Sequence, residues 1–242
     1  MKRYGLIGHP LGHSFSKAYF TERFEREKID ACYELFDLAD IQELPGLLKQ
    51  HPDLCGFNVT LPYKEAIIPF LDELDPDAEA VGAVNTVKIL EDGKLIGYNT
   101  DIIGLSFLTS HLPSLTSQPS LILGTGGASK AVQYVLKKNN IPFHLVSRNP
   151  KQGQFSYEDL TPDIIKEHLL IVNATPVGMA PNINEAPRIP YEAITAKHTL
   201  FDLIYNPEET LFLRYGREHG ATTVNGLKML HAQAEASWKI WN

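Results

Sequence analysis

Short apolar runs alternate along the chain with segments in which apolar residues recur every three or four positions. The runs predict strands and the periodic segments predict helices. Predicted strands cover residues 3–7, 31–37, 54–59, 83–90, 94–98, 121–124, 143–147, 169–174 and 200–204. Predicted helices cover residues 16–28, 41–50, 102–111, 129–139, 157–168, 209–219 and 227–241, with a short one from Pro62. Repeated β–α alternation predicts an α/β fold, with parallel sheet covered by helices on both faces.

Two features divide this pattern into two domains. The sequence EDGK at 91–94 lies between two short strands and has Asp-Gly at its centre, which predicts a hairpin. The run 121–123 is apolar throughout, as in strands buried on both faces, so a second sheet with its own core is expected there. We expect an N-terminal α/β domain over residues 1–101 and a Rossmann-like, doubly wound domain over 102–225, with a cleft between them. The last helix could pack on either domain.

Composition narrows the class of protein. The chain of 242 residues is 43% hydrophobic and 21% charged, with a formal net charge of −7, which is typical of a soluble globular protein. No basic block stands out and no apolar stretch approaches ~18 residues, so we expect neither a nucleic-acid partner nor a membrane span. Cys32 and Cys55 share no motif and are interpreted as small buried hydrophobes, in a cytoplasmic protein without a metal site.

The sequence LGTGGASKA at 123–131 predicts a dinucleotide-binding turn. Gly124, Gly126 and Gly127 follow a predicted strand and open a predicted helix, which is the context that such a turn requires. Gly124 allows the tight turn, and Gly126 lets a pyrophosphate approach the backbone at the helix N-terminus. Ser129 stands where the strict motif has a third glycine, and it is small enough for close packing. The alternative is a glycine-rich turn without a ligand.

The end of the next predicted strand indicates which dinucleotide would bind. NAD sites carry a carboxylate there, which holds the ribose 2′-hydroxyl. This chain has Ser147, Arg148 and Asn149 instead, with Lys151 close by. Because a guanidinium suits a 2′-phosphate, we expect NADP(H) rather than NAD(H). The alternative is that Arg148 is a solvated arginine at the end of a strand.

Small polar residues gather at the ends of elements in the N-terminal half. They are Ser14, Ser16, Asn58, Thr60, Asn85, Thr86, Asn99, Thr100 and Asp101. Each has a local explanation, because serines cap helices and Asn-Thr-Asp is ordinary turn chemistry. In extended backbone, Ser14 and Ser16 would share a face. Together, these clusters at the ends of strands predict a site for a polyhydroxylated ligand.

Lys64 stands in an unusual place. It falls in the first turn of the short helix from Pro62, where the helix dipole disfavours a cation. Among the first-half motifs, Lys64 and Asp101 are the residues suited to proton transfer, so Lys64 is a candidate acid oriented by Asp101. The rival acid–base residues are histidines, which we interpret as structural or solvated: His9, His13 and His231.

Taken together, the motifs resemble those of shikimate dehydrogenases. GHSFSK, GFNVTLPYKE, GAVNTV, GYNTDIIG, LGTGGASKA, VNATPVGM and NGLKMLHAQAEASW occur in that family's order and at nearly its spacings. The resemblance covers essentially the whole chain. It implies a two-domain enzyme that reduces 3-dehydroshikimate with NADPH in the chorismate and aromatic amino-acid pathway, as a monomer or homodimer.

The resemblance also implies particular site residues. Lys64 and Asp101 would form the catalytic pair. Substrate contacts would come from Ser14, Ser16, Asn58, Thr60, Asn85, Tyr205 and Gln233. Cofactor contacts would come from Gly124, Gly126, Gly127, Ala128, Ser147, Arg148, Asn149, Gly226 and Met229. The first domain would bind the substrate and would be completed by a C-terminal helix over residues 226–242.

The chain departs from the family pattern at three places. Lys17 and Tyr19-Phe20 replace the usual Pro and His-Asn after the serines, and the segment 150–168 is short. Ser147 replaces an asparagine and Gln152 a second arginine, so the clamp on the 2′-phosphate is expected to be weaker. The alternatives are a quinate/shikimate dehydrogenase with relaxed cofactor use, a non-catalytic NADP-binding sensor and, more distantly, a folate-type dehydrogenase.

Overall fold

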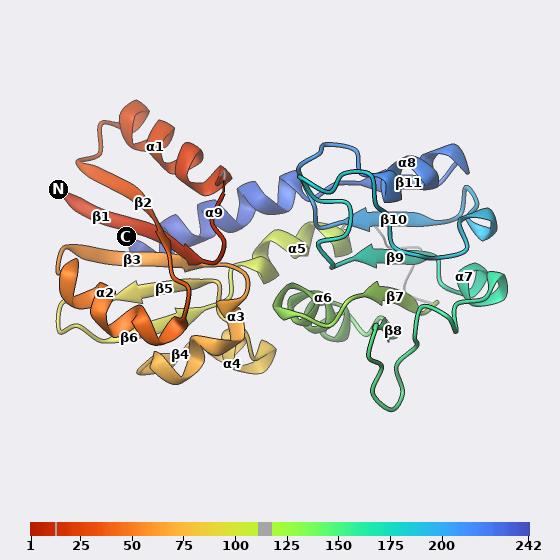
Figure 1. Ribbon diagram of the computed structural model, residues 1–242, viewed down its shortest axis with the longest axis horizontal. Coiled ribbons are helices and arrows are strands. Elements are labelled where there is room, and N and C mark those ends of the chain that lie inside the picture. The colour runs from red at the N-terminus through yellow and green to blue at the C-terminus, as the bar shows by residue number, and fades with distance from the viewer. Residues whose placement is uncertain (13, 111–117) are drawn as a thin grey trace. The chain divides into compact units, whose positions relative to one another are not determined.

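The structure, a computed structural model, describes residues 1–12, 14–110 and 118–242. His13 and the predicted helix end at His111 lie outside these residues. The described chain forms two compact units (Figure 1). One comprises Met1–Thr100 with Ala234–Asn242, and the other comprises Asp101–Gln233.

The first unit contains a mixed sheet whose described strands number six, in the order β2-β1-β3-β5-β6-β4. They are β1 (Lys2–Gly8), β2 (Ala31–Asp37), β3 (Leu54–Val59), β4 (Glu73–Leu74), β5 (Thr86–Ile89) and β6 (Leu95–Tyr98). The first strand runs parallel to both its neighbours, whereas β5 is antiparallel to β3 and to β6. The predicted hairpin around EDGK, and with it the antiparallel pairing of β5 with β6, is thus confirmed, while the expectation of parallel pairing is wrong for β5 beside β3.

The helices of the first unit are shorter and more broken than expected. They are α1 (Phe15–Glu27), α2 (Leu44–Gln50), α3 (Tyr63–Ala66), α4 (Pro76–Val81), the single 3-10 turns η1 (Ile41–Glu43) and η2 (Ile68–Phe70), and the end of α9 (Leu227–Trp241). The segment expected as one helix from Pro62 becomes α3, η2 and the strand β4. A further helix, α4, was not expected from the sequence; Asp75 caps it by accepting from the Asp77 N–H at 3.0 Å.

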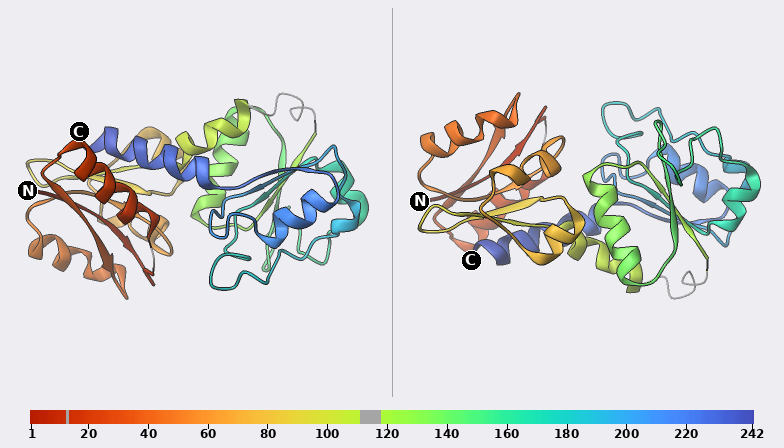
Figure 2. Two further views of the ribbon diagram at one scale, coloured as in Figure 1. Left: turned by 90° about the horizontal axis from the view of Figure 1, so that it is seen from above. Right: turned by 90° about the horizontal axis from the view of Figure 1, so that it is seen from below.

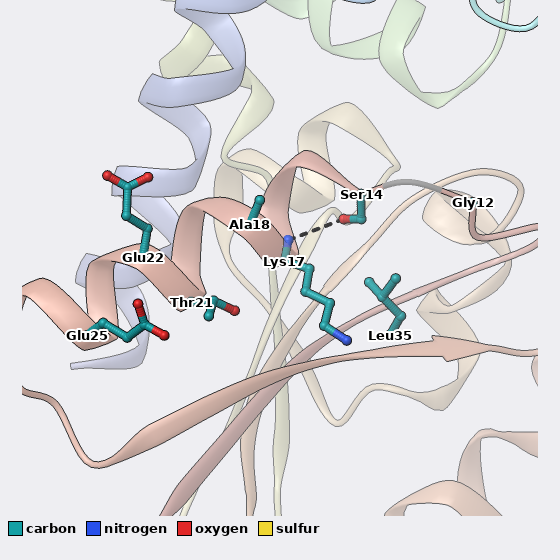
Figure 3. A pocket seen from close by; sticks show the side chains of 8 residues that line it. All are labelled: Gly12, Ser14, Lys17, Ala18, Thr21, Glu22, Glu25 and Leu35. Atoms are coloured by element: carbon teal, nitrogen blue, oxygen red, sulfur yellow. Dashed lines mark hydrogen bonds between the residues drawn. The ribbon is translucent and has the colours of Figure 1, made fainter.

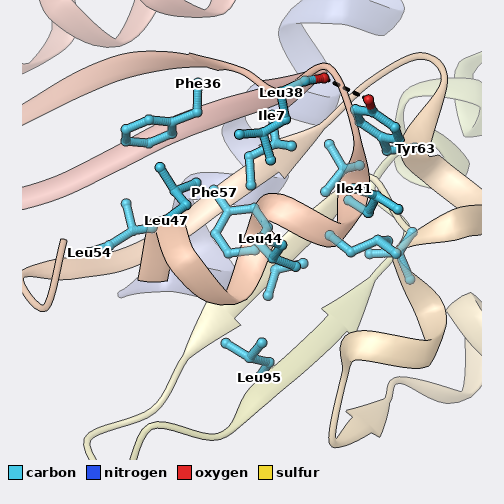
Figure 4. Close-up of a cluster of buried hydrophobic side chains, with 14 of the residues drawn as sticks. Ile7, Phe36, Leu38, Ile41, Leu44, Leu47, Leu54, Phe57, Tyr63 and Leu95 are labelled. Carbon is cyan, nitrogen blue, oxygen red and sulfur yellow. Dashed lines mark hydrogen bonds between the residues drawn. The ribbon is translucent and has the colours of Figure 1, made fainter. Parts of the chain in front are cut away.

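Two hydrophobic clusters cover the two faces of this sheet, because neighbouring residues of β1 point to opposite sides. Ile7 belongs to the larger cluster, which lies beneath α2 and α3 (Figure 4). Tyr63 closes that cluster by donating its hydroxyl to the carbonyl of Leu38 at 2.6 Å. Tyr4 and Leu6 belong to the second cluster, with aromatic residues of α1 and α9.

The packing of Trp241 settles which sheet the end of the last helix joins. Its ring stacks on that of Tyr4 with 4.9 Å between centroids, and its Nε1 donates to the carbonyl of Val87 at 2.9 Å. A Cβ atom on Gly56 would lie 2.4 Å from the same nitrogen, so only glycine leaves room for the indole. The C-terminal part of α9 is therefore part of the first core.

The second unit contains a parallel sheet in which the described strands number five, in the order β11-β10-β9-β7-β8. They are β7 (Ser120–Leu123), β8 (Phe143–Val146), β9 (Leu170–Asn173), β10 (Thr199–Asp202) and β11 (Thr222–Val224). Its helices are α5 (Asp101–Ser110), α6 (Gly127–Lys138), α7 (Pro162–Glu167), α8 (Leu211–Glu218), the start of α9 and the turn η4 (Tyr191–Ala193). Figure 2 shows α6 and α8 on opposite faces of the sheet, which confirms the predicted doubly wound fold.

The strand order defines where a ligand would sit in this unit. Numbered from β7, it is the flavodoxin-like order 2-1-3-4-5, in which the chain reverses direction across the sheet between β7 and β9. Ligands of such sheets bind at this switch point, outside the carboxyl ends of the strands. The sequence analysis missed β11, and the helix expected over 157–168 begins only at Pro162.

We predict that Trp241→Ala destabilises the protein by about 3–5 kcal/mol, because it leaves a cavity between the sheet and α9 and removes the donor to Val87. Urea denaturation followed by circular dichroism measures the effect. Lys239→Ala, an exposed change on the same helix, is the control. A loss no larger than that of the control would contradict this account of the core.

Candidate active site

The glycine turn lies at the switch point of the second sheet. Gly124 follows β7 with a φ of +102°, a conformation that favours glycine. A Cβ atom there would lie 2.9 Å from Cγ2 of Thr175, in the loop after β9. Ser129 is fully buried and donates its hydroxyl to the carbonyl of Gly124 at 2.7 Å. The serine that replaces the third glycine of the motif therefore closes the turn.

Gly126 differs from Gly124, because nothing inside the protein requires a glycine there. Its φ of −80° and ψ of −175° suit any residue, and an added Cβ would meet no atom within 4 Å. It is the N-cap of α6, and no side chain caps this helix end. The amide groups that begin a helix and lack a capping partner suit an anion. Gly127 is buried, and Ala128 half-buried, in the first turn that follows.

Arg148 lies on a closed loop that follows β8. The Ser147 N–H donates to the carbonyl of Phe155 at 2.9 Å, and the Phe155 N–H donates to that of Leu145 at 2.9 Å. Ser147 Oγ also accepts from the Asn149 N–H at 3.2 Å, so this serine shapes the turn on either side of Arg148. Arg148 itself is exposed, and its charge counteracts the rise that burial gives to the pKa of Tyr157.

The short helix that carries Lys64 differs from expectation. α3 has only four residues, and Pro62 precedes it instead of occupying its first position. In a helix of one turn, the first and last turns are the same residues, so the dipole does not distinguish an unfavourable end for Lys64. The dipole argument is therefore wrong, and the half-buried Lys64 needs another reason for its position.

That reason is a buried pair of residues, Val84 and Asn85, each of which bonds a different neighbouring segment. We call this pair the join at residues 84–85. The Val84 N–H donates to the carbonyl of Lys64 at 2.7 Å. The next side chain, Asn85, accepts the Thr100 N–H at Oδ1, also at 2.7 Å. Thr100 directly precedes Asp101, which is 4% exposed. One short segment thus holds the backbone of Lys64 and the residue that leads into Asp101.

Asn58 lies in a buried polar network rather than on an open surface. It is 4% exposed, and its Nδ2 donates to Oγ of Ser237 at 2.9 Å and to Oγ1 of Thr86 at 3.1 Å. Its Oδ1 accepts from the Tyr33 hydroxyl at 2.8 Å, and burial raises the pKa of that phenol. The network engages both the amide nitrogen and the amide oxygen of Asn58, and its predicted contact with substrate stays a prediction. Thr60, half-buried, follows the end of β3.

The two serines near the N-terminus play different parts. Ser14 is the N-cap of α1 and accepts from the Lys17 N–H at 3.3 Å, whereas Ser16 is already helical. The expectation of a shared extended face is therefore wrong, and the capping alternative describes Ser14. An open hollow of about 460 Å³ adjoins Ser14 between α1 and β2 (Figure 3). Glu22 and Glu25 line it with one cation, Lys17, so its charged groups sum to a net negative charge, which suits an anionic ligand poorly.

The last group of expected site residues surrounds the start of α9. The Gly226 N–H donates to the carbonyl of Ile204 at 3.0 Å, and an added Cβ would lie 2.2 Å from the Leu203 oxygen. Met229 packs on Gly104 of α5, where an added Cβ would lie 2.7 Å from Met229 Cγ. The other two are Tyr205, which is half-buried, and Gln233, which donates to the carbonyl of Leu230 at 3.0 Å.

Two of the three rival histidines, His9 and His231, fall within the described residues. His9 Nδ1 lies 2.6 Å from Oδ1 of Asp37, whose other oxygen accepts from the Leu11 N–H at 3.0 Å. This amide and His9 hold the pKa of Asp37 below its usual value. His231 is exposed on α9. Across residues 1–12, 14–110 and 118–242, no three His, Cys, Asp or Glu side chains cluster as metal ligands.

Sequence reasoning missed two buried polar residues next to the expected site. Ser237 has no exposed surface, and its Oγ also lies 2.8 Å from Oγ1 of Thr86. Asp202 ends β10 with no exposed surface, and burial raises its pKa to about 6. The available signal for Asp202 was a carboxylate at the end of an apolar strand. Ser237 gave none, since a serine in a helix is ordinarily a surface residue.

This doubly wound sheet with a glycine turn at its switch point, in one chain with a second α/β unit, is typical of dinucleotide-binding proteins. The family model for the shikimate dehydrogenase substrate binding domain matches residues 6–87. A shikimate dehydrogenase (NADP(+)) of Methanococcus maripaludis is 43% identical over 258 residues, which cover 99% of this chain and 91% of the relative. The chain belongs to the shikimate dehydrogenase family, as its motifs predicted, and is an oxidoreductase acting on CH–OH groups.

Solved structures agree with this assignment. Shikimate dehydrogenase from Aquifex aeolicus has a TM-score of 0.88 at 35% identity, covering 100% of this chain and 92% of its own. The Thermus thermophilus enzyme in complex with NADP(H) and shikimate has a TM-score of 0.87 at 34% identity, covering 100% and 94%. The Methanococcus and Thermus relatives confirm NADP(H) as the predicted cofactor. In the part of this chain that the structure describes, no helix is both long and apolar enough to span a bilayer.

We predict that Ser237→Ala lowers the free energy of unfolding by about 1–3 kcal/mol, because the buried polar groups of Asn58 and Thr86 lose a partner. Urea denaturation measures the change. Thr21→Ala, which removes an exposed hydroxyl from α1, is the control and is expected to stay within about 0.5 kcal/mol of the parent. Equal effects of the two changes would show that the network contributes nothing to stability.

Proposed function

We propose that this protein catalyses the reversible reduction of 3-dehydroshikimate to shikimate with NADPH, in the pathway to chorismate and the aromatic amino acids. In this proposal the first unit binds the substrate and the second binds NADP(H). The observation that carries it is the join at residues 84–85, which holds the Lys64 backbone and the residue before Asp101. The identity of the substrate is inferred from the relatives that match nearly the whole chain.

Reduction of a ketone places negative charge on its oxygen, so a proton donor must lie beside that atom. When bound, NADPH supplies the hydride. Lys64 donates the proton to the carbonyl oxygen, and Asp101 orients its ammonium group. In the oxidative direction the same lysine accepts the proton. Hydroxyl and amide groups of the first unit orient the ring hydroxyls of the substrate, so that analogues lacking those hydroxyls are rejected.

Two features of the second unit support NADP(H) as the cofactor. The first is Gly126, whose backbone is open to a pyrophosphate although neither its conformation nor its packing requires glycine. The second is Arg148, exposed on a loop that lacks the carboxylate of NAD sites. Lys151 lies on the same loop, where it adds positive charge towards a 2′-phosphate.

The test of the proposed function is absorbance at 340 nm with the purified protein. Shikimate and quinate are each compared with NADP⁺ and NAD⁺. We expect the highest kcat/KM with shikimate and NADP⁺. A preference for quinate would favour a quinate/shikimate dehydrogenase. NADP⁺ binding without turnover of either compound would favour a sensor.

We predict that Lys64→Ala lowers kcat at saturating shikimate by about 10²–10⁴-fold, because the carbonyl oxygen loses its proton donor. Steady-state kinetics at 340 nm measure the change. Lys17→Ala is the matched control, since Lys17 is an exposed lysine in the first turn of α1 in the same unit. Near-parental kcat in Lys64→Ala would rule out the acid–base assignment.

We predict that Arg148→Ala raises the KM for NADP⁺ about tenfold or more and changes the KM for NAD⁺ little, because only NADP⁺ has a 2′-phosphate to pair with the guanidinium. Initial rates with each cofactor measure the two values. Arg188→Ala, an exposed arginine elsewhere in the same unit, is the control. Equal rises in both KM values would place Arg148 away from the 2′-phosphate.

A further inference from the structure

Asp202 is a buried carboxylate that the proposed mechanism does not use. It is the last residue of β10 and has no exposed surface. Three groups donate to it: Asn173 Nδ2 at 3.1 Å and the Ile204 N–H at 3.0 Å to Oδ1, and the Thr210 hydroxyl at 2.6 Å to Oδ2. Burying a carboxylate costs free energy even when it is hydrogen-bonded. We therefore ask what the protein gains from Asp202 at this position.

The contacts continue from Asp202 to the neighbouring strand. Asn173 is its register partner at the end of β9. While Nδ2 of Asn173 faces Asp202, its Oδ1 accepts from Thr175, at 2.6 Å from the hydroxyl and 3.1 Å from the N–H. The nitrogen of the amide therefore binds the carboxylate, and its oxygen holds the loop after β9. An amide bound on both sides cannot rotate without breaking bonds to both partners.

Thr175 carries the contacts on to the glycine turn after β7. Its Cγ2 would lie 2.9 Å from a Cβ atom on Gly124, and the carbonyl of Ala174 would lie 3.1 Å from it. The three strands concerned are neighbours in the order β10-β9-β7. The hydrogen bonds Asp202–Asn173–Thr175, together with the methyl of Thr175 close beside Gly124, run along the carboxyl edge of the sheet and end at its switch point. We name this set of residues the carboxylate relay.

The far end of the relay is anchored as firmly. Thr210, which donates to Asp202, is also the N-cap of α8 and accepts from the Leu213 N–H at 3.4 Å. The loops after β9 and β10 are joined again where the Ala180 N–H donates to the carbonyl of Asn206 at 3.1 Å. The loop after β10 contains Tyr205 and supports Gly226 through Ile204.

We propose that Asp202 is a positioning residue for the cofactor: through Asn173 and Thr175 it holds the turn at Gly124 in the geometry that the pyrophosphate needs. The inference rests on the proposed function in one respect, since it takes this turn as part of the NADP(H) site. Asp202 touches neither reactant in this account. It affects cofactor binding through Asn173 and Thr175. The effects of substituting Asp202 and Thr175 on the Kd for NADPH must therefore be non-additive.

The test measures Kd for NADPH by nicotinamide fluorescence in Asp202→Asn, Thr175→Val and the double variant. Asp202→Asn keeps the size of the side chain and removes its charge. Thr175→Val keeps the methyl beside Gly124 and removes the hydroxyl. We expect about a tenfold rise in Kd for Asp202→Asn and about three- to tenfold for Thr175→Val. The double variant is expected to bind no more weakly than the weaker single variant.

Thr195→Val is the matched control, because Thr195 bonds His198 in the turn before the opposite end of the same strand. Its Kd is expected to stay within about twofold of the parent, at a comparable loss of thermal stability. Unchanged Kd values in both single variants, an equal effect of Thr195→Val, or single effects that multiply in the double variant would each overturn the inference.

The same titrations separate this inference from the proposed function, because they contain no shikimate. If the parent binds NADPH and the variants show the expected non-additive Kd values, but the parent does not oxidise shikimate, the proposed function is wrong and the positioning role is supported. If the parent turns over shikimate but the variants lack the non-additive Kd values, the positioning role alone is wrong. No NADPH binding by the parent would overturn both.

Discussion

The first unit depends on one buried side-chain oxygen. Asn85 Oδ1 accepts the Thr100 N–H at 2.7 Å and the Thr100 hydroxyl at 3.1 Å, in a residue that is only 3% exposed. A buried amide oxygen without such donors would be costly, so the position of Thr100 is set as strongly as the core itself. Through Thr86 and Ser237 the same network reaches α9, which joins the C-terminal end of the chain to the strands of the first sheet.

The two units solve the same problem with different chemistry. Each must hold several loops at the ends of strands, where backbone groups lack the partners that a sheet provides. The first unit uses neutral amides and hydroxyls, which donate and accept in turn. The second uses a carboxylate, which only accepts and therefore orders the three donors aimed at it. A charged centre gives stronger bonds at a greater desolvation cost, which is visible in the raised pKa of Asp202.

The sequence predicted the α/β class, the second parallel sheet and the hairpin, because these depend on hydrophobic periodicity and on turn residues. Periodicity predicted α9 with its correct bounds but left its packing partner open; only the family resemblance implied the first domain, because the packing depends on the fit of Trp241 over Gly56. It failed for the segment after Pro62, where prolines and short apolar runs leave no period long enough to separate a helix from a turn. Local patterns also could not reveal that Asn58 bonds Tyr33 and Ser237, since those partners are 25 and 179 positions away.

Gly126 is a glycine at a position where the folded protein does not require one. Its dihedral angles are open to any residue and no neighbour would resist a methyl group. In the unfolded chain a glycine samples more conformations than an alanine, so keeping it typically forgoes about 0.4–1 kcal/mol of stability at such a compatible position. The folded protein gains no packing in return. The turn is thus less stable than the same backbone could make it, and it keeps the N-terminus of α6 open where the proposed pyrophosphate would bind.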